Sequence, residues 1–247
     1  MIARRSAYEI ARRNISNSDY RYVVNIDGGS DKISTDCFEV LQECDADVVE
    51  FNGHRVYGAS QFYTPRHARV CDVIPCQQMF LCDLVQYNIW LKFIKREVWE
   101  AVMDITPELR LNFAEDVFYT GALAVKARDW EFVDQVWYTY DNSPESMSRK
   151  SSNDALDQNM REFSLAIGLL GKLPEYQNPF LKTSFLLRYL RTLLWQDTLV
   201  PARRGWSARL LKIARSRYKA VKVAHHTLVF TLVVLAGLTG AFIRWKR

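Results

Sequence analysis

A short apolar run that ends in a glycine turn between two acidic residues constrains the fold of this chain most strongly. Residues 22–26 are apolar apart from Asn25, and Asp27-Gly28-Gly29-Ser30-Asp31 follows directly. A continuous apolar run that is bounded by a turn predicts a strand buried on both faces. Carboxylates at the end of a strand can hold a divalent cation and a diphosphate. Asp next to Gly also favours turns for purely local reasons, so both interpretations stay open.

A second acidic pair, Glu115-Asp116, stands at the start of a predicted helix over residues 115–128. Apolar residues at helical spacing, among them Val117 and Val125, predict that helix. An acid held at such a position can act as a general base, although acids also favour helix starts because they complement the helix dipole. The two acidic sites together suggest group transfer from an activated, phosphorylated donor.

Strand and helix patterns alternate over the first 140 residues, which predicts an α/β fold. Strands are expected over residues 46–52 and 132–140, and an irregular hairpin over residues 54–70. Asp36 with Glu39 three positions later resembles a capping box, so a helix is expected from there to Cys44. Three lysine and arginine residues after Trp90 are most simply read as a solvated face; they are Lys92, Lys95 and Arg96.

The rest of the chain favours helices. Residues 151–200 predict a helical extension whose first helix is capped by Ser152 and carries Phe163, Ile167 and Leu170 on its apolar side. Pro174 and Pro179 are expected to interrupt it. We therefore divide the chain into an α/β domain over residues 1–150, a helical extension over 151–200, and a third region over 201–247.

Charge separates this third region from the rest. Of the 33 Lys and Arg residues, eleven lie after Asp197 and no Asp or Glu does, which leaves 22 basic against 28 acidic residues before that point. A basic amphipathic helix is expected over residues 206–224, eight basic residues lie from Arg203 to Lys222, and seventeen uncharged residues, 227–243, follow. At 1.5 Å per residue that run is about 26 Å long, slightly short of a typical hydrocarbon core.

We therefore expect a membrane-anchor helix at residues 227–243, either spanning a thin bilayer or lying partly in one, with a buried hydrophobic helix as the alternative. The basic residues on both sides place the body of the protein on the cytoplasmic side. They favour an anionic membrane over nucleic acid as the partner, because they flank an apolar run.

The cysteines do not form a recognisable framework. There are five of them, and their spacing is that of neither paired CxxC motifs nor a zinc site; they are Cys37, Cys44, Cys71, Cys76 and Cys82. Free thiols in a reducing compartment are expected. Residues 1–5 include charges but no apolar run follows them, so no signal peptide is expected.

Six segments between residues 6 and 149 carry a family resemblance through their order and spacing. They are residues 11–26, 27–31, 46–52, 90–97, 113–118 and 138–148. Read together, they resemble the motifs of family 2 glycosyltransferases of the GT-A fold. Residues 27–31 fall where that family has its metal-binding DxD motif, and Phe113-Ala114-Glu115-Asp116-Val117-Phe118 is similar to its f-x-E-D-v-x-f motif. The resemblance implies a partial GT-A-like (Rossmann-like) mixed sheet with helices.

The resemblance also implies nucleotide-sugar chemistry. Asp27 and Asp31 would bind Mn²⁺ or Mg²⁺ against the diphosphate of a nucleotide-sugar donor, a Lewis-acid role for the metal. Arg149 could contact the same diphosphate. Asp116 would be the general base of an inverting displacement, with Glu115 supporting it. Trp90 could offer an apolar face to the acceptor sugar, although a tryptophan is more often a core residue.

Two departures from the family pattern limit this interpretation. The acid turn spaces its carboxylates four residues apart, and it could instead be the family's nucleotide loop. The family's first strand and its base-binding acid have no counterpart in this sequence. The expected function is sugar transfer to a lipid-linked or surface-polysaccharide acceptor at the cytoplasmic membrane face. The alternatives are a truncated, non-catalytic membrane-associated relative and a chain whose fold a partner chain completes.

Overall fold

The computed structural model describes residues 20–26, 31–55, 61–63, 76–81, 85–109, 111, 114–140, 153–177, 179, 183, 187, 216–225, 227–228 and 231. The chain divides into two compact units, Met1–Arg149 and Lys150–Arg247, and each is described by itself. The division at residue 200 stays a prediction.

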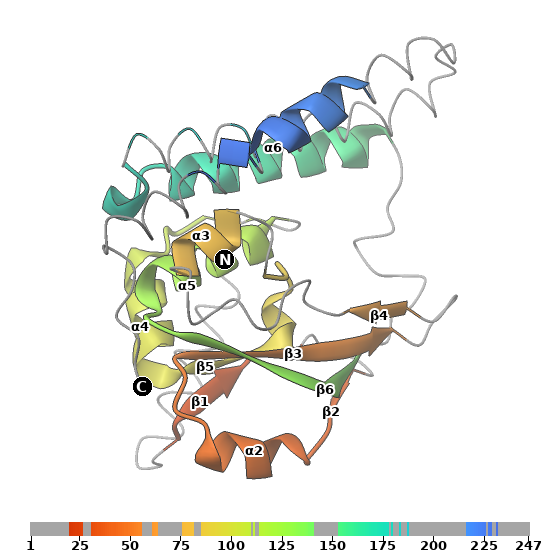
Figure 1. Ribbon diagram of the computed structural model, residues 1–247, viewed down its shortest axis with the longest axis vertical. Helices are drawn as coiled ribbons and strands as arrows, with labels where there is room; N and C mark the ends of the chain where they lie inside the picture. The colour runs from red at the N-terminus through yellow and green to blue at the C-terminus, as the bar shows by residue number, and fades with distance from the viewer. Residues whose placement is uncertain are drawn as a thin grey trace. The chain divides into compact units, whose positions relative to one another are not determined.

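The first unit is a mixed α/β structure built on a six-stranded sheet (Figure 1). The strands are β1 (Tyr22–Val24), β2 (Lys32–Ile33), β3 (Val48–Arg55), β4 (Gln61–Tyr63), β5 (Lys92–Lys95) and β6 (Trp130–Tyr140). Their order is β1-β5-β3-β6-β2, and β4 pairs with β3. β3 and β6 run parallel, and every other pair is antiparallel. The predicted α/β class with a mixed sheet is therefore confirmed.

Helices lie on both faces of this sheet (Figure 1). They are α2 (Cys37–Glu43), α3 (Cys76–Leu81), the 3₁₀ helix η1 (Ile89–Leu91), α4 (Arg96–Ile105) and α5 (Glu115–Lys126). α2 lies against one face, whereas α3, α4 and α5 lie on the opposite side, where α5 packs against both α3 and α4. In the sequence, α3, α4 and α5 all lie between the parallel strands β3 and β6, and α5 carries the acid pair.

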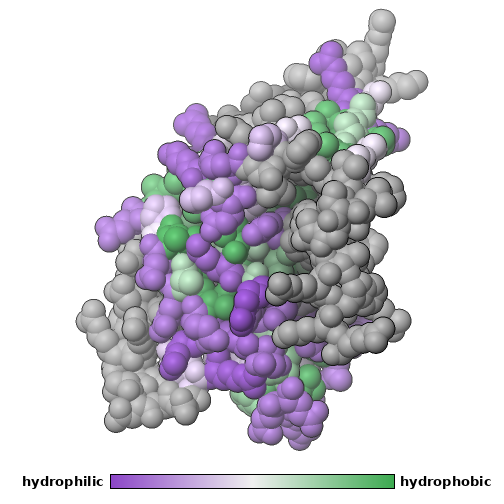
Figure 2. Space-filling model, turned by 60° about the vertical axis from the view of Figure 1, so that its left-hand side comes forward, coloured by the Kyte–Doolittle hydropathy of each residue, from purple (hydrophilic) through white to green (hydrophobic). Residues whose placement is uncertain are grey.

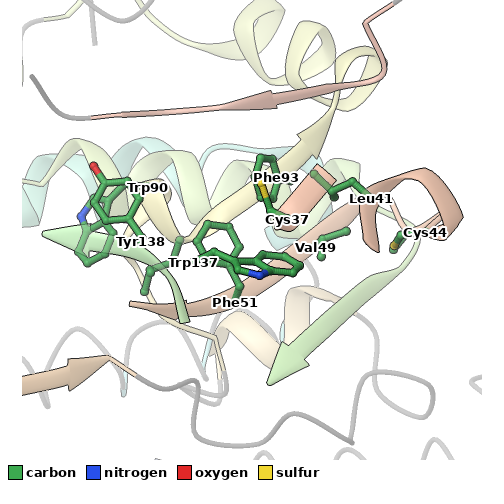
Figure 3. Close-up of a cluster of buried hydrophobic side chains, with 11 residues drawn as sticks. Cys37, Leu41, Cys44, Val49, Phe51, Trp90, Phe93, Trp137 and Tyr138 are labelled. Atoms are coloured by element: carbon green, nitrogen blue, oxygen red, sulfur yellow. The ribbon is translucent and has the colours of Figure 1, made fainter. Parts of the chain in front are cut away.

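Alternate side chains of a strand point to the same face of the sheet, and this explains how α2 is held against it. Val49 and Phe51 of β3 point to the same face and pack with Phe93 and Trp137, and Leu41 of α2 completes the cluster (Figure 3). The Phe51 ring lies 5.1 Å from the Phe93 ring and 5.4 Å from the Trp137 ring, centroid to centroid. Each fully buried large apolar side chain of this kind contributes about 1.5–3 kcal/mol.

Two local predictions are wrong. β1 is half-buried, and among the described strands it pairs with β5 alone and ends the strand order, so its apolar run does not mark burial on both faces. Asp36 does precede α2, but its side chain makes no capping hydrogen bond. Its backbone is already helical (φ −61°, ψ −19°), whereas a capping side chain needs the extended conformation in order to reach back to the helix N–H groups.

The second unit is helical where it is described. α6 (Asn153–Leu170) buries Phe163, Ile167 and Leu170, as predicted, and the 3₁₀ helix η3 (Pro174–Tyr176) follows it. Residues 216–225 are also helical. Most of the expected membrane-anchor helix at residues 227–243 lies outside the described residues, and among the residues that are described no helix has the length and apolarity to cross a membrane.

Large hydrophobic side chains reach the surface singly. They are Ile26, Phe38, Val136, Leu165 and Val223, and each lies on a different segment of the chain. Among the residues coloured in Figure 2, most are hydrophilic, with small hydrophobic groups between them. Scattered exposure of this kind is ordinary for folded proteins and does not itself mark a binding surface.

Candidate functional site

The acid pair occupies the first turn of α5. Glu115 and Asp116 are the first two residues of the helix, and both are half-exposed. Ala114 precedes them and offers no side-chain cap. The predicted helix start is confirmed, and the carboxylates lie where the helix dipole favours negative charge.

Of the acid turn, the structure describes Asp31; Asp27 and the predicted diphosphate contact Arg149 lie outside the described residues. The Tyr138 hydroxyl donates a hydrogen bond of 2.7 Å to Oδ2 of Asp31. Because β2 pairs with β6 in the register Ile33 to Tyr138, Asp31 lies at the carboxyl end of β6. In open α/β sheets, ligands bind beyond the carboxyl ends of the strands.

Trp90 lies in the aromatic core next to this carboxylate. Its ring stacks on Tyr140, with centroids 5.2 Å apart and an 8° angle between the planes. It also contacts Tyr138 at 4.6 Å, and only 3% of its surface is exposed. Figure 3 shows the Trp90 and Tyr138 rings side by side. The rings that pack against Trp90 therefore belong to the protein itself. The contact between Trp90 and an acceptor sugar stays a prediction.

The interpretation of Lys92, Lys95 and Arg96 as a solvated face is wrong. Lys92 is fully buried and Lys95 is 7% exposed. Arg96 is half-exposed, and its guanidinium lies 5.3 Å from the centre of the Tyr20 ring. The two lysines are buried because each has carboxylate partners on β3 or just before it: Glu50 for Lys92, and Asp45 and Asp47 for Lys95.

Sequence reasoning also missed Glu50 and its pairing with Lys92. Nζ of Lys92 donates hydrogen bonds to the carbonyls of Gln86 (2.6 Å) and Asn88 (2.9 Å) and lies 3.7 Å from Oε1 of Glu50. A signal was present in the sequence: Glu50 lies between Val49 and Phe51, and Lys92 lies between Leu91 and Phe93. A charge inside an apolar run is buried only where it is paired.

The surroundings of this pair set its electrostatics. Glu50 accepts hydrogen bonds from the Gln86 backbone N–H (2.8 Å) and the Trp130 indole N–H (2.9 Å). Burial raises the pKa of Glu50 and lowers the pKa of Lys92, because water no longer solvates either charge. The carboxylates of Glu50 and Asp116 oppose the shift of the Lys92 pKa. Asp116 therefore acts electrostatically on the buried ammonium.

One segment connects the two predicted acidic sites. Trp90 contacts Tyr138, which binds Asp31, and Lys92, two residues further on, interacts with Asp116. η1 of the same segment packs against both α5 and β3. Asp31 thus reaches the segment from Gln86 to Lys92 through Tyr138 and Trp90, and Asp116 lies in the first turn of α5, the helix that packs against η1 of that segment.

Of the two predicted metal ligands, Asp31 is the one that the structure describes, and its carboxylate is held by the hydrogen bond from Tyr138. Within the part of the chain that the structure describes, no three His, Cys, Asp or Glu side chains come together as a metal-binding group. The pairing of Asp31 with Asp27 around a cation stays a prediction.

Neither a protein-family model nor a curated protein matches this chain. Solved structures with a similar backbone include Staphylococcus aureus TarS 1-349. Its complex with UDP-GlcNAc has a TM-score of 0.48 at 15% identity, covering 96% of this chain and 72% of that one. For the complex with UDP the TM-score is 0.40 at 14% identity, covering 94% and 70%, and for TarS 1-349 alone it is 0.41 at 14%, covering 96% and 71%.

Proposed function

We propose that this chain is a glycosyltransferase that moves a sugar from a nucleotide-sugar donor to an acceptor hydroxyl, with Asp116 as the general base. The observation that carries the proposal is the position of Asp116: a partly exposed carboxylate in the first turn of α5, the helix whose Thr120 hydroxyl binds the loop that holds the buried ammonium of Lys92. Pairs of titratable groups with perturbed environments cluster at functional sites. The ordered motifs that resemble family 2 glycosyltransferases give the reaction class.

The reaction is a single displacement at the anomeric carbon. Asp116 removes the proton of the acceptor hydroxyl while the acceptor oxygen forms its bond to the anomeric carbon. The bond between that carbon and the diphosphate oxygen breaks, and its electron pair leaves with the nucleoside diphosphate. Glu115, the neighbouring acid in the same helical turn, supports the base or contacts the acceptor.

The donor side of the proposal involves three charged residues. Asp27 and Asp31 would hold Mn²⁺ or Mg²⁺, which when bound supplies a Lewis acid that offsets the charge of the diphosphate. The hydrogen bond from Tyr138 supports this role for Asp31, because it orients the carboxylate. Arg149 would bind the diphosphate directly.

The acceptor side follows from the charge distribution. We propose a lipid-linked or surface-polysaccharide acceptor, with Trp90 near its sugar, at the cytoplasmic face of a membrane. Arg217 and Lys219 are exposed on the helical segment 216–225, and Lys222 is partly exposed. Each such charge near an anionic surface is worth about 1 kcal/mol. The apolar run at residues 227–243 would anchor the chain beside them.

The test is turnover of a panel of UDP-sugars with Mn²⁺, measured as release of UDP. Asp116→Asn should lower the rate by roughly 10²–10⁴-fold, because the base is lost, while UDP binding measured by calorimetry persists. Asp104→Asn, an exposed acid on the neighbouring helix α4, is the matched control and should not change the rate. Equal turnover of Asp116→Asn and the parent protein contradicts the assignment of the base. Absence of UDP binding in the parent protein favours the non-catalytic alternative.

A further inference from the structure

We propose that Lys92 is a positioning residue for Asp116: its buried ammonium, fixed by two backbone carbonyls of a loop that also binds α5, orients the Asp116 carboxylate for proton transfer. This inference rests on the proposed function, since it gives Lys92 a part in the same reaction. Lys92 is assigned no contact with donor or acceptor, and acts through Asp116.

The geometry begins with three consecutive carbonyls. Gln86 and Asn88 accept hydrogen bonds from Nζ of Lys92 at 2.6 and 2.9 Å. The carbonyl between them, that of Tyr87, accepts a hydrogen bond of 2.8 Å from the Thr120 hydroxyl of α5. The same three-residue loop thus fixes both the ammonium and one face of α5.

Helical periodicity then places Asp116 on that face. Asp116 and Thr120 are four residues apart in α5, so their side chains lie on one side of the helix, one turn apart. Because Thr120 is tied to Tyr87, the turn that carries Asp116 faces the loop that holds Lys92. The electrostatic interaction between the two charges agrees with this placement.

Glu50 is an ion-pair partner of Lys92, but the shortest contacts of the ammonium are with backbone carbonyls. Oε1 and Oε2 of Glu50 accept hydrogen bonds from the Gln86 N–H and the Trp130 indole, while Nζ of Lys92 lies 3.7 Å away, longer than an ordinary hydrogen bond. The Nζ atom instead donates to neutral carbonyls. Burial lowers the pKa of Lys92, and the carboxylate of Glu50 and, to a smaller extent, that of Asp116 favour its charged form.

Stability alone does not require this arrangement. Replacing a buried ion pair by well-packed apolar residues is often neutral or stabilising, because desolvation of both charges is expensive. A buried ammonium beside a carboxylate of a proposed base does have a use: the attraction is mutual and is weakly screened in the interior, so it favours the ionised form of Asp116. Lys95, at the other end of β5, has no such neighbour and provides a comparison within the same strand.

The experiment compares Lys92→Met with Lys95→Met in the full chain. For Lys92→Met we expect a 10- to 100-fold lower kcat with little change in the donor KM, and an acidic limb of the kcat/KM profile moved up by at least about one pH unit. Lys95→Met should leave the position of that limb unchanged. Glu50→Gln/Lys92→Met, which leaves no unpaired buried charge, should fold like the parent protein and show the same shift of the limb.

A second readout does not depend on turnover. Carbon-detected NMR with ¹³C-carboxyl aspartate, assigned through Asp116→Asn, reports the titration of Asp116 directly, and Lys92→Met should raise its midpoint while Lys95→Met does not. An unchanged midpoint in both Lys92 variants overturns the inference. If Asp116→Asn retains full turnover, the proposed function fails instead, and the NMR midpoint still decides whether Lys92 acts on Asp116.

Discussion

Gly53 of β3 allows the aromatic cluster beside Asp31 to form. A Cβ atom at this position would lie 2.7 Å from Cδ2 of Leu91 and 2.9 Å from Cζ3 of Trp90. Neither neighbour has room to move, because Leu91 is fully buried and Trp90 packs against Tyr138 and Tyr140. Trp90 contacts Tyr138, the tyrosine that binds Asp31. The small size of Gly53 therefore makes room for the ring that packs beside the candidate site.

Gly53→Ala should therefore lower the free energy of unfolding by about 1–3 kcal/mol, the range for overpacking a well-filled core. Urea denaturation of each variant against the parent protein measures it. Gly168→Ala is the matched control, because no heavy atom lies within 4 Å of its Cβ position in α6. There the change should stabilise the protein by roughly 0.5–1 kcal/mol, since glycine is a poor residue inside a helix. A Gly53→Ala protein as stable as its parent would contradict the packing described above.

For single residues, the sequence predicted the secondary structure around a residue better than it predicted the distant residues that the residue contacts. The first turn of α5 was predicted at Glu115-Asp116 because helical spacing and acids at a helix start are local signals. Burial of Lys92 was missed because its partner Glu50 is on another strand, and both become paired only when β3 and β5 align. Tyr138 as the partner of Asp31 is equally non-local, being 107 residues away.

At the level of helices and strands, hydrogen bonds of Asp47 connect the start of β3 to its neighbours. Its carboxylate accepts hydrogen bonds from the Arg128 backbone N–H at 2.9 Å and from Nζ of Lys95 at 3.3 Å. The backbone N–H of Asp47 in turn donates to Oδ1 of Asp129 at 2.6 Å. Burial raises the pKa of Asp47, but these cationic and N–H partners outweigh it, so its pKa lies below the ordinary value. β3, β5 and the segment between α5 and β6 thus share one carboxylate.

Asp47→Asn should cost about 2–3 kcal/mol at neutral pH, because hydrogen bonds to a charged acceptor are lost. Since the folded pKa is depressed, the stabilisation is fully present above the unfolded pKa of about 3.9 and is lost as the pH falls through the folded pKa. Urea denaturation from pH 7 to pH 3 should show the two proteins converging in acid. Asp45→Asn is the control: its side chain is 84% exposed although it pairs with Lys95, so solvent screens it. If Asp45→Asn lowered the free energy of unfolding as much as Asp47→Asn does, this account would be contradicted.

Whether a segment forms a helix or a strand was easier to predict than where that segment lies in the fold. The strand over residues 46–52 and the helix over 115–128 correspond to β3 and α5, because both carry clear periodicity. The apolar run at residues 22–26 gave the strand but not its place: β1 is at the edge of the sheet and half-buried. An apolar run shows that a strand can be buried on both faces. Whether it is buried depends on the position of the strand in the sheet. The capping box failed for a similar reason, because the spacing of Asp36 and Glu39 does not fix the backbone angles of Asp36.

At the scale of the whole molecule, the charge is distributed unevenly along the chain. All 28 acidic residues lie in the first 197 positions, whereas the last 50 contain only basic charges. This asymmetry is visible in the sequence alone, because it needs no folding to be counted. The mixed sheet could be anticipated from the alternation of elements, but the parallel pairing of β3 with β6 depends on contacts between distant segments.

The basic region should determine binding to anionic membranes. Neutralising Arg217, Lys219 and Lys222 with glutamine removes three charges from the helical segment 216–225. At about 1 kcal/mol per charge, partitioning onto vesicles with anionic lipid should fall by roughly a hundredfold. Co-sedimentation of the full chain with vesicles, with and without anionic lipid, measures the change.

The control separates a local basic surface from net charge alone. Lys32, Lys126 and Lys172 lie outside that segment, and changing all three to glutamine gives the same net charge. If the basic helix binds the headgroups directly, this variant should retain most of the partitioning, and raised salt should weaken both proteins because screening shortens the reach of the charges. Equal losses in the two triple variants would show that overall charge governs the attraction, and membrane docking through residues 216–225 would then be wrong.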